Sequence, residues 1–157
     1  MNRRKFIKQT SAAVSLAAIG GLTLPSFTTK NQKQITILHT NDTHSHIEPF
    51  EATHYKYANK GGVARRATLI EHVRKENPNT LLLDAGDIFQ GTPYFNYFGG
   101  ELEFKLMSML KYDLATIGNH DFDNSIEGLY KQLPHAKFNF VSANYDFSNT
   151  VLDTHVK

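Results

Sequence analysis

The sequence predicts an α/β fold, in which short apolar strands alternate with amphipathic helices. Two patterns indicate this fold: the alternation itself, and the polar residues that follow the strands. Strands are expected at residues 34–39, 80–83, 114–117 and 138–142. Helices are expected at residues 62–75, 101–111 and 125–133. Four strands with three helices between them argue for a layered α/β arrangement rather than an all-helical or all-strand one.

Each expected element has its own local signal. The segment Gln-Ile-Thr-Ile-Leu-His at 34–39 is apolar enough for a buried strand. Apolar residues at helical spacing mark one face of the first helix: Val63, Ala67, Ile70 and Val73. The second helix repeats that spacing with Leu102, Leu106, Met109 and Leu110. The third is expected to begin at Ser125, a capping residue type, with Glu127 in its first turn.

Residues 86–100 are rich in aromatic side chains: Phe89, Tyr94, Phe95, Tyr97 and Phe98. The favoured interpretation is that these rings pack over the sheet. The alternative is a wall on which a nucleobase stacks, worth about 1–3 kcal/mol per ring.

The first 28 residues resemble an export signal. Basic residues come first, and an apolar stretch from Ser11 to Leu24 follows, too short for a stable membrane span. The pair Arg3-Arg4, followed by Lys5-Phe6-Ile7-Lys8, resembles the twin-arginine signal. That resemblance implies the twin-arginine export machinery as a partner and a periplasmic or cell-surface location. An ordinary secretory signal or a retained N-terminal anchor is the alternative.

Composition excludes several classes of function. The 157 residues contain no cysteine, which rules out disulfides, thiolate zinc sites and thiol nucleophiles. The net charge is +2, but Arg3, Arg4, Lys5 and Lys8 lie in the leader and no acidic residue precedes Asp42. The remainder of the chain is therefore not basic, and binding to a nucleic acid polymer is not indicated.

Ligand-type residues follow each of the first three expected strands. Residues 40–44 read Thr-Asn-Asp-Thr-His, 84–87 read Asp-Ala-Gly-Asp, and 118–123 read Gly-Asn-His-Asp-Phe-Asp. In open α/β sheets, ligands bind beyond the carboxyl ends of the strands. Carboxylate, imidazole and amide groups suit divalent cations, and two such cations can clamp a phosphoryl group. Asp84 alone is expected to accept backbone N–H groups at its strand end rather than to bind metal.

These motifs resemble the 5′-nucleotidase family of calcineurin-like metallophosphoesterases. The resemblance rests on 38–44, Gly61-Gly62-Val63-Ala64-Arg65, 83–92 and 118–123, and it covers residues 35 to about 147. It implies a β-sandwich flanked by helices, of which this chain would form half. It also implies hydrolysis of nucleotides at a dinuclear site of Mn, Zn, Co or Ca with a metal-activated water.

The resemblance also implies roles for individual residues. Asp42 and His44 would hold the first metal, Asp87 would bridge both metals, and Asn119 would bind the second. His120 would stabilise the transition state, and Asp123 would orient and charge His120. Asp121 stands where the family often has Glu, and no direct role is assigned to it. Arg65 is expected to be structural, and Asn144 to support the site; no substrate-binding residue is assigned.

The resemblance leaves ligands unaccounted for, because the family draws further histidines from the second half of its catalytic domain. We therefore expect residues 29–157 to form an incomplete N-terminal part of that domain, inactive alone, with apolar surface exposed on one face of the sheet. An alternative is that the chain is a truncated, non-catalytic metal-binding remnant. In-frame coding sequence beyond codon 157 would favour the enzyme.

Overall fold

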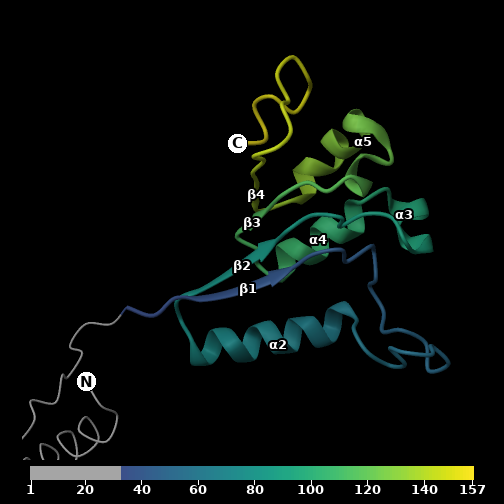
Figure 1. Ribbon diagram of the computed structural model, residues 1–157, viewed down its shortest axis with the longest axis vertical. Helices are drawn as coiled ribbons and strands as arrows, with labels where there is room; N and C mark the ends of the chain where they lie inside the picture. The colour runs from purple at the N-terminus through teal and green to yellow at the C-terminus, as the bar shows by residue number, and fades with distance from the viewer. Residues whose placement is uncertain (1–32) are drawn as a thin grey trace, which may run out of the picture. The chain divides into compact units, whose positions relative to one another are not determined.

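The computed structural model describes residues 33–157. The export signal predicted over residues 1–28 lies outside this part of the chain. Within it, no helix is long and apolar enough to cross a membrane. The described residues form a four-stranded sheet with its strands in the order β1-β2-β3-β4, each parallel to its neighbour (Figure 1). The α/β prediction is confirmed.

The strands lie where the sequence predicts them but are mostly shorter. Their bounds are Thr36–Thr40 for β1, Thr80–Asp84 for β2, Leu114–Ala115 for β3 and Asn139–Phe140 for β4. A strand includes only the residues that pair with a neighbouring strand, and β3 and β4 therefore have two residues each. Apolar character continues beyond these pairs, which explains why the sequence predicts longer strands.

Helices connect successive strands. Their bounds are Val63–Glu76 for α2, Pro93–Phe98 for α3, Glu101–Met109 for α4 and Ser125–Gln132 for α5. Two short 3₁₀ turns, η1 at His120–Phe122 and η2 at Leu133–His135, flank α5. Helix α3 is absent from the sequence-based prediction, although Pro93 at its first position and Gly99 in the left-handed conformation just beyond its end are typical helix boundaries.

One face of the sheet packs against the helices. Alternate strand residues are buried there, with Leu82, Ala115 and Phe140 each at most 3% exposed. They join Ile70 of α2 and Phe104 of α4 in one core. Right-handed connections between parallel strands taken in consecutive order place all helices on the same side, which accounts for this arrangement.

The opposite face of the sheet is exposed. Its apolar residues include Ile37 at 60% exposure, Leu81 at 42% and Leu114 at 37%. This is the apolar surface that the sequence leads us to expect on one side of the sheet.

The aromatic segment 86–100 divides between the core and the surface. Phe89 and Phe95 are buried, with ring centroids 5.4 Å apart, and Phe89 also packs on Phe104 at 4.8 Å. Tyr97, by contrast, is 84% exposed. Packing, the favoured interpretation, therefore holds for the two buried rings.

Candidate metal centre

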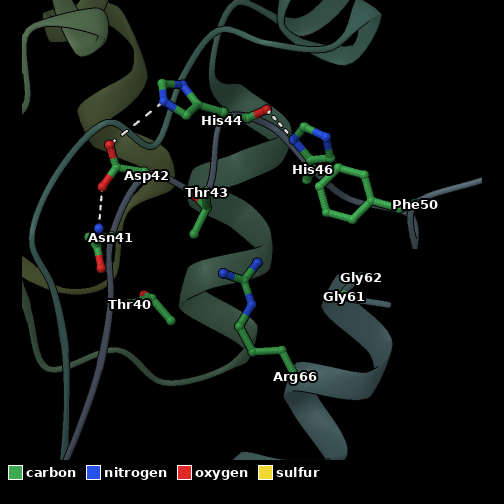
Figure 2. A pocket seen from close by; sticks show the side chains of 10 residues that line it. All are labelled: Thr40, Asn41, Asp42, Thr43, His44, His46, Phe50, Gly61, Gly62 and Arg66. Atoms are coloured by element: carbon green, nitrogen blue, oxygen red, sulfur yellow. Dashed lines mark hydrogen bonds and ion pairs between the residues drawn. The ribbon is translucent and has the colours of Figure 1, made fainter. Parts of the chain in front are cut away.

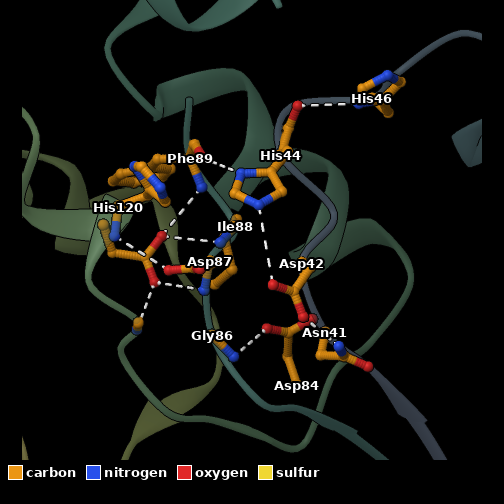
Figure 3. Close-up of polar contacts among 12 residues, drawn as sticks. Asn41, Asp42, His44, His46, Asp84, Gly86, Asp87, Ile88, Phe89 and His120 are labelled. Atoms are coloured by element: carbon orange, nitrogen blue, oxygen red, sulfur yellow. Dashed lines mark hydrogen bonds and ion pairs between the residues drawn. The ribbon is translucent and has the colours of Figure 1, made fainter. Parts of the chain in front are cut away.

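The loops that follow β1, β2 and β3 meet at one edge of the sheet. The parallel register of the strands explains why these loops meet. Thr40 pairs with Asp84, and Asp84 pairs with Ala115, so all three strands end at the same level. The β1 loop then runs along the β2 loop: Asp42 N donates to Gly86 O at 2.9 Å, and His44 N donates to Asp87 O at 3.1 Å. The polar side chains after these strands are therefore brought together (Figure 3).

Asp42, His44 and Asp87 form a group that suits a metal ion. Each offers a ligand atom, and the three atoms lie within 4.8 Å of one another. All three residues have positive φ, at 50°, 45° and 55°. This left-handed conformation costs a non-glycine residue about 1–3 kcal/mol and is concentrated at functional sites, where the surrounding structure enforces it. Here the hydrogen bonds between the two loops enforce it.

The imidazole of His44 is oriented for ligation. Its Nδ1 lies 3.2 Å from the carbonyl oxygen of Phe89, which can only accept a hydrogen bond. In the neutral ring, Nδ1 then carries the proton and Nε2 keeps the lone pair that a metal ion would use. Nε2 lies 3.8 Å from Oδ1 of Asp42. Metal-binding histidines commonly donate their second ring N–H to a carbonyl or carboxylate in this manner.

Asn119 shares a cavity with the carboxylates. This cavity, of about 390 Å³, is lined by Asp42, Asp87, Asn119, Asn144 and Tyr145 among others. Two carboxylates and two carboxamides thus face one space, a donor set that suits hard or borderline divalent cations. Asn119 and Asn144 therefore line the same cavity as Asp42 and Asp87.

Close contact between the β2 and β3 loops requires glycine. A Cβ on Gly118 would overlap the Asp87 carboxylate and backbone nitrogen, and a Cβ on Gly86 would lie 2.5 Å from the backbone nitrogen of Gly118. With both side chains absent, His120 N donates to Asp87 Oδ1 at 3.0 Å. The two loops consequently approach closely enough to share one site.

His120 and Asp123 form a pair beside this group. His120 Nδ1 lies 3.1 Å from Asp123 Oδ2, and the His120 ring stands edge-on to His44 with centroids 5.3 Å apart. The hydrogen bond with Asp123 raises the pKa of His120 above its ordinary value of 6.5, against the opposing effect of partial burial. A larger fraction of the imidazole is therefore protonated near neutral pH, as a donor to an anionic oxygen requires.

A second hollow, of about 480 Å³, adjoins the group on the side of α2. Asp42 and His44 line it together with Phe50 and Arg66, and Figure 2 shows Arg66 extending from α2 into it. The sequence does not single out Arg66. Its neighbour Arg65 donates instead to the backbone carbonyl of Asn59, which agrees with the structural role expected for it.

Two buried carboxylates support the loops. Asp84, 5% exposed, accepts Gly86 N at 2.9 Å, as the sequence predicts for it, and also accepts the Thr40 hydroxyl at 2.5 Å. Burial raises its pKa from 3.8 to about 6. Asp121, 2% exposed, accepts four backbone N–H groups, and burial raises its pKa as well. Sequence reasoning missed the role of Asp121; the only available signal was an acidic residue inside a tight Gly-containing loop.

The elevated pKa of Asp84 predicts a pH effect on stability. Because the folded-state pKa lies above the ordinary value, the stabilising protonated form is lost as pH rises from about 4 to about 6. Asp84→Asn stays neutral, can still accept from Gly86 N, and can donate to the Thr40 hydroxyl. In chelator-treated protein we expect this variant to be more stable than the wild type at pH 7, by up to about 3 kcal/mol, with no advantage at pH 4.

Urea unfolding of both proteins between pH 4 and 7 measures this difference. The exposed substitution Asp153→Asn is the matched control. Parallel stability profiles for wild type and Asp84→Asn would show that burial does not penalise the Asp84 carboxylate.

Comparison with known proteins places the chain in a family. The family model described as calcineurin-like phosphoesterase matches residues 35–157. The chain belongs to this family. Its members are metal-dependent phosphoesterases, which agrees with the resemblance noted in the motifs, and the homologues found are 5′-nucleotidase hydrolases.

The relatives are much longer than this chain. Snake venom 5′-nucleotidase of Crotalus adamanteus is 47% identical over 115 residues, which cover 71% of this chain and 20% of that protein. The human 5′-nucleotidase is 42% identical over 137 residues, covering 84% of this chain and 23% of that protein. The chain thus spans between a fifth and a quarter of the length of the curated relatives it matches.

Solved structures agree on the fold. A 5′-nucleotidase precursor from Thermus thermophilus superposes with a TM-score of 0.70 at 44% identity, covering 78% of this chain and 24% of that one. The NAD nucleotidase of Haemophilus influenzae gives a TM-score of 0.71 at 35% identity, covering 78% of this chain and 26% of that one.

Proposed function

We propose that this chain is part of an exported, metal-dependent phosphoesterase that hydrolyses nucleotides. The observation that carries the proposal is one cluster at one sheet edge: the metal-ligand group Asp42, His44 and Asp87, with the His120–Asp123 pair beside it. A metal group alone would fit many roles. An imidazole whose pKa is raised, placed next to it, is a donor suited to stabilising charge on a transferring phosphoryl group.

The metal centre we propose is dinuclear. Asp42 and His44 would hold one ion, Asn119 would hold the other, and Asp87 would bridge them, because its carboxylate lies between the β1 and β3 loops. Manganese, zinc, cobalt and calcium all accept this oxygen and nitrogen donor set. Two divalent cations supply Lewis-acid stabilisation of phosphoryl oxygens and lower the pKa of a water.

The residues of the chain itself would orient the substrate and supply a proton donor. With Nδ1 engaged by Asp123, His120 would offer Nε2–H to a phosphoryl oxygen. Asp123 fixes the ring and favours the imidazolium through its hydrogen bond. Asn119 and Asn144 offer amide groups in the same cavity as the carboxylates. As negative charge develops on the phosphoryl oxygens, these donors would stabilise it.

Nucleotides are the substrate class we propose. The relatives bear the names 5′-nucleotidase and NAD nucleotidase, and the family model covers residues 35–157, which include the loops of the cluster. A role in nucleotide catabolism follows from hydrolysis of nucleoside monophosphates.

Assay of the protein expressed from its natural gene tests this function. After chelation and reloading with Mn²⁺, we expect phosphate release from AMP and about two Mn²⁺ bound per chain. Treatment with chelator should abolish the activity reversibly. If the Mn²⁺-loaded protein releases no phosphate from AMP or from a generic phosphoester, it is not the phosphoesterase proposed here.

Export by the twin-arginine route is the location we propose, on the basis of Arg3 and Arg4. Changing both to Lys preserves charge but removes the paired guanidinium groups. We expect the Lys-Lys variant to accumulate in the cytoplasm, as measured by cell fractionation and immunoblotting. Changing Lys5 and Lys8 to Arg is the matched control. Undiminished export of the Lys-Lys variant would indicate the general secretory route instead.

A further inference from the structure

The carboxylate of Asp121 links two loops of the metal centre. It lies on η1 and is 2% exposed. Its Oδ1 accepts Ile88 N at 2.8 Å and Phe89 N at 2.9 Å, while its Oδ2 accepts Gly118 N at 2.8 Å and Asp87 N at 3.1 Å. Figure 3 labels three of the donor residues, Asp87, Ile88 and Phe89, side by side along the β2 loop. Three of the four donors are successive amides of the β2 loop, and the fourth belongs to the β3 loop.

These bonds act on the backbone of Asp87, whose φ is 55°. Amides 87–89 all point at one carboxylate, which holds the chain in that left-handed turn. The Asp87 side chain is held from the other loop, because His120 N donates to its Oδ1 at 3.0 Å. Asp121 therefore restrains the main chain of Asp87, while the β3 loop holds the Asp87 carboxylate. Together these contacts fix the Asp87 carboxylate relative to Asn119 and His120.

We propose that Asp121 is a positioning residue of the metal centre: it sets the spacing between Asp87 on the β2 loop and Asn119 on the β3 loop. This inference rests on the proposed function, since it presumes that the two loops share metal. Asp121 does not touch the metal in this role. It acts by offering four acceptor positions to four N–H donors, a match that a carboxylate provides and a carboxamide does not.

Asp121→Asn tests the proposal with almost no change in shape. The amide group would present N–H to two of the four backbone N–H donors, so one pair of contacts is lost while volume is kept. Loss of partners that orient metal ligands typically lowers affinity 10–100-fold. We expect a weakening of about this size for Mn²⁺ alone, measured by the EPR signal of free Mn²⁺ on the protein expressed from its natural gene.

Asp84→Asn is the matched control. Asp84 is also a buried carboxylate at the end of β2, but it accepts only one backbone N–H and none from the β3 loop. We expect this variant to bind Mn²⁺ within about threefold of the wild type. Amide NMR gives a second readout, which general destabilisation would not mimic: in Asp121→Asn the signals of residues 87–89 and 118 should shift and exchange faster.

Asp121→Glu keeps a carboxylate, which only accepts hydrogen bonds. This variant tests the proposal if Asp121→Asn does not fold. We expect the folded Glu variant to bind Mn²⁺ within about tenfold of the wild type. If Asp121→Asn folds and its affinity for Mn²⁺ is unchanged, the positioning role is wrong. The positioning role is also wrong if Asp121→Glu folds and binds no Mn²⁺. Neither result would contradict the proposed metal centre. If the wild-type protein from the natural gene binds no Mn²⁺, the proposed metal centre is wrong and the role of Asp121 is wrong with it.

Discussion

Replacing Asp87 by Asn is expected to remove most of the bound metal. Asp87 belongs to the three-residue ligand group and also contacts the β3 loop. Its negative charge would therefore neutralise both metal ions of the proposed centre. Loss of groups that only orient ligands already costs 10–100-fold in affinity. A change in a bridging ligand should cost at least about 100-fold, with near-complete loss of phosphoesterase activity.

The substitution is conservative for the fold, which makes the result interpretable. Asn tolerates the left-handed φ of 55°, and its side-chain oxygen can still accept the N–H of His120. Mn²⁺ content after dialysis, measured by elemental analysis, is the direct readout, with circular dichroism as a check on folding. The control is Asp153→Asn, an exposed residue remote in sequence from the ligand loops. Unchanged Mn²⁺ content in a folded Asp87→Asn protein would show that the bridging assignment is wrong.

The sequence was sufficient to predict which residues gather at the site. Parallel strands bring their carboxyl ends to one edge, so residues after β1, β2 and β3 had to converge once those strands were recognised. Asp42, His44 and Asp87 meet as this rule requires. The orientation of each ligand side chain depends on backbone features that the sequence shows only indirectly. One such feature is the positive φ of all three residues.

What escaped prediction depends on tertiary contacts. Nothing in local spacing distinguishes Asp121, which is buried among backbone amides, from Asp123, which pairs with His120 at the surface of the site. Both follow the same histidine within three residues. Only the position of the β2 loop decides which of the two carboxylates turns inward.

Helix α3 was missed for a different reason. Most of its six residues are aromatic, and aromatic content is a weak helix signal. The boundary residues were visible all the same: Pro93 at the first position, and Gly99 with φ of 60° after the last. Boundary chemistry was therefore the better guide to this short element than the character of its interior.

His120→Ala is expected to lower kcat by about 10²–10³-fold, the scale for one lost transition-state donor, with little change in KM. The reason is that His120 lies beside the ligand group rather than within it: its ring is 5.3 Å from that of His44, and its Nδ1 is engaged by Asp123. Mn²⁺ content should accordingly stay close to that of the wild type. This outcome separates His120 from Asp87, whose replacement should remove metal and activity together.

Asp123→Asn should act in the same direction but more weakly, and it adds a pH signature. The hydrogen bond with the charged Asp123 is the main cause that raises the pKa of His120. A neutral amide stabilises the imidazolium less, so that pKa falls and the protonated imidazole disappears at lower pH. The alkaline limb of the kcat profile should therefore move to lower pH in Asp123→Asn and vanish in His120→Ala. Steady-state kinetics on the Mn²⁺-loaded protein from the natural gene, across about pH 5 to 9, provide the measurement. A change in His120→Ala confined to KM would mean that His120 binds the ground state and does not act on the transition state.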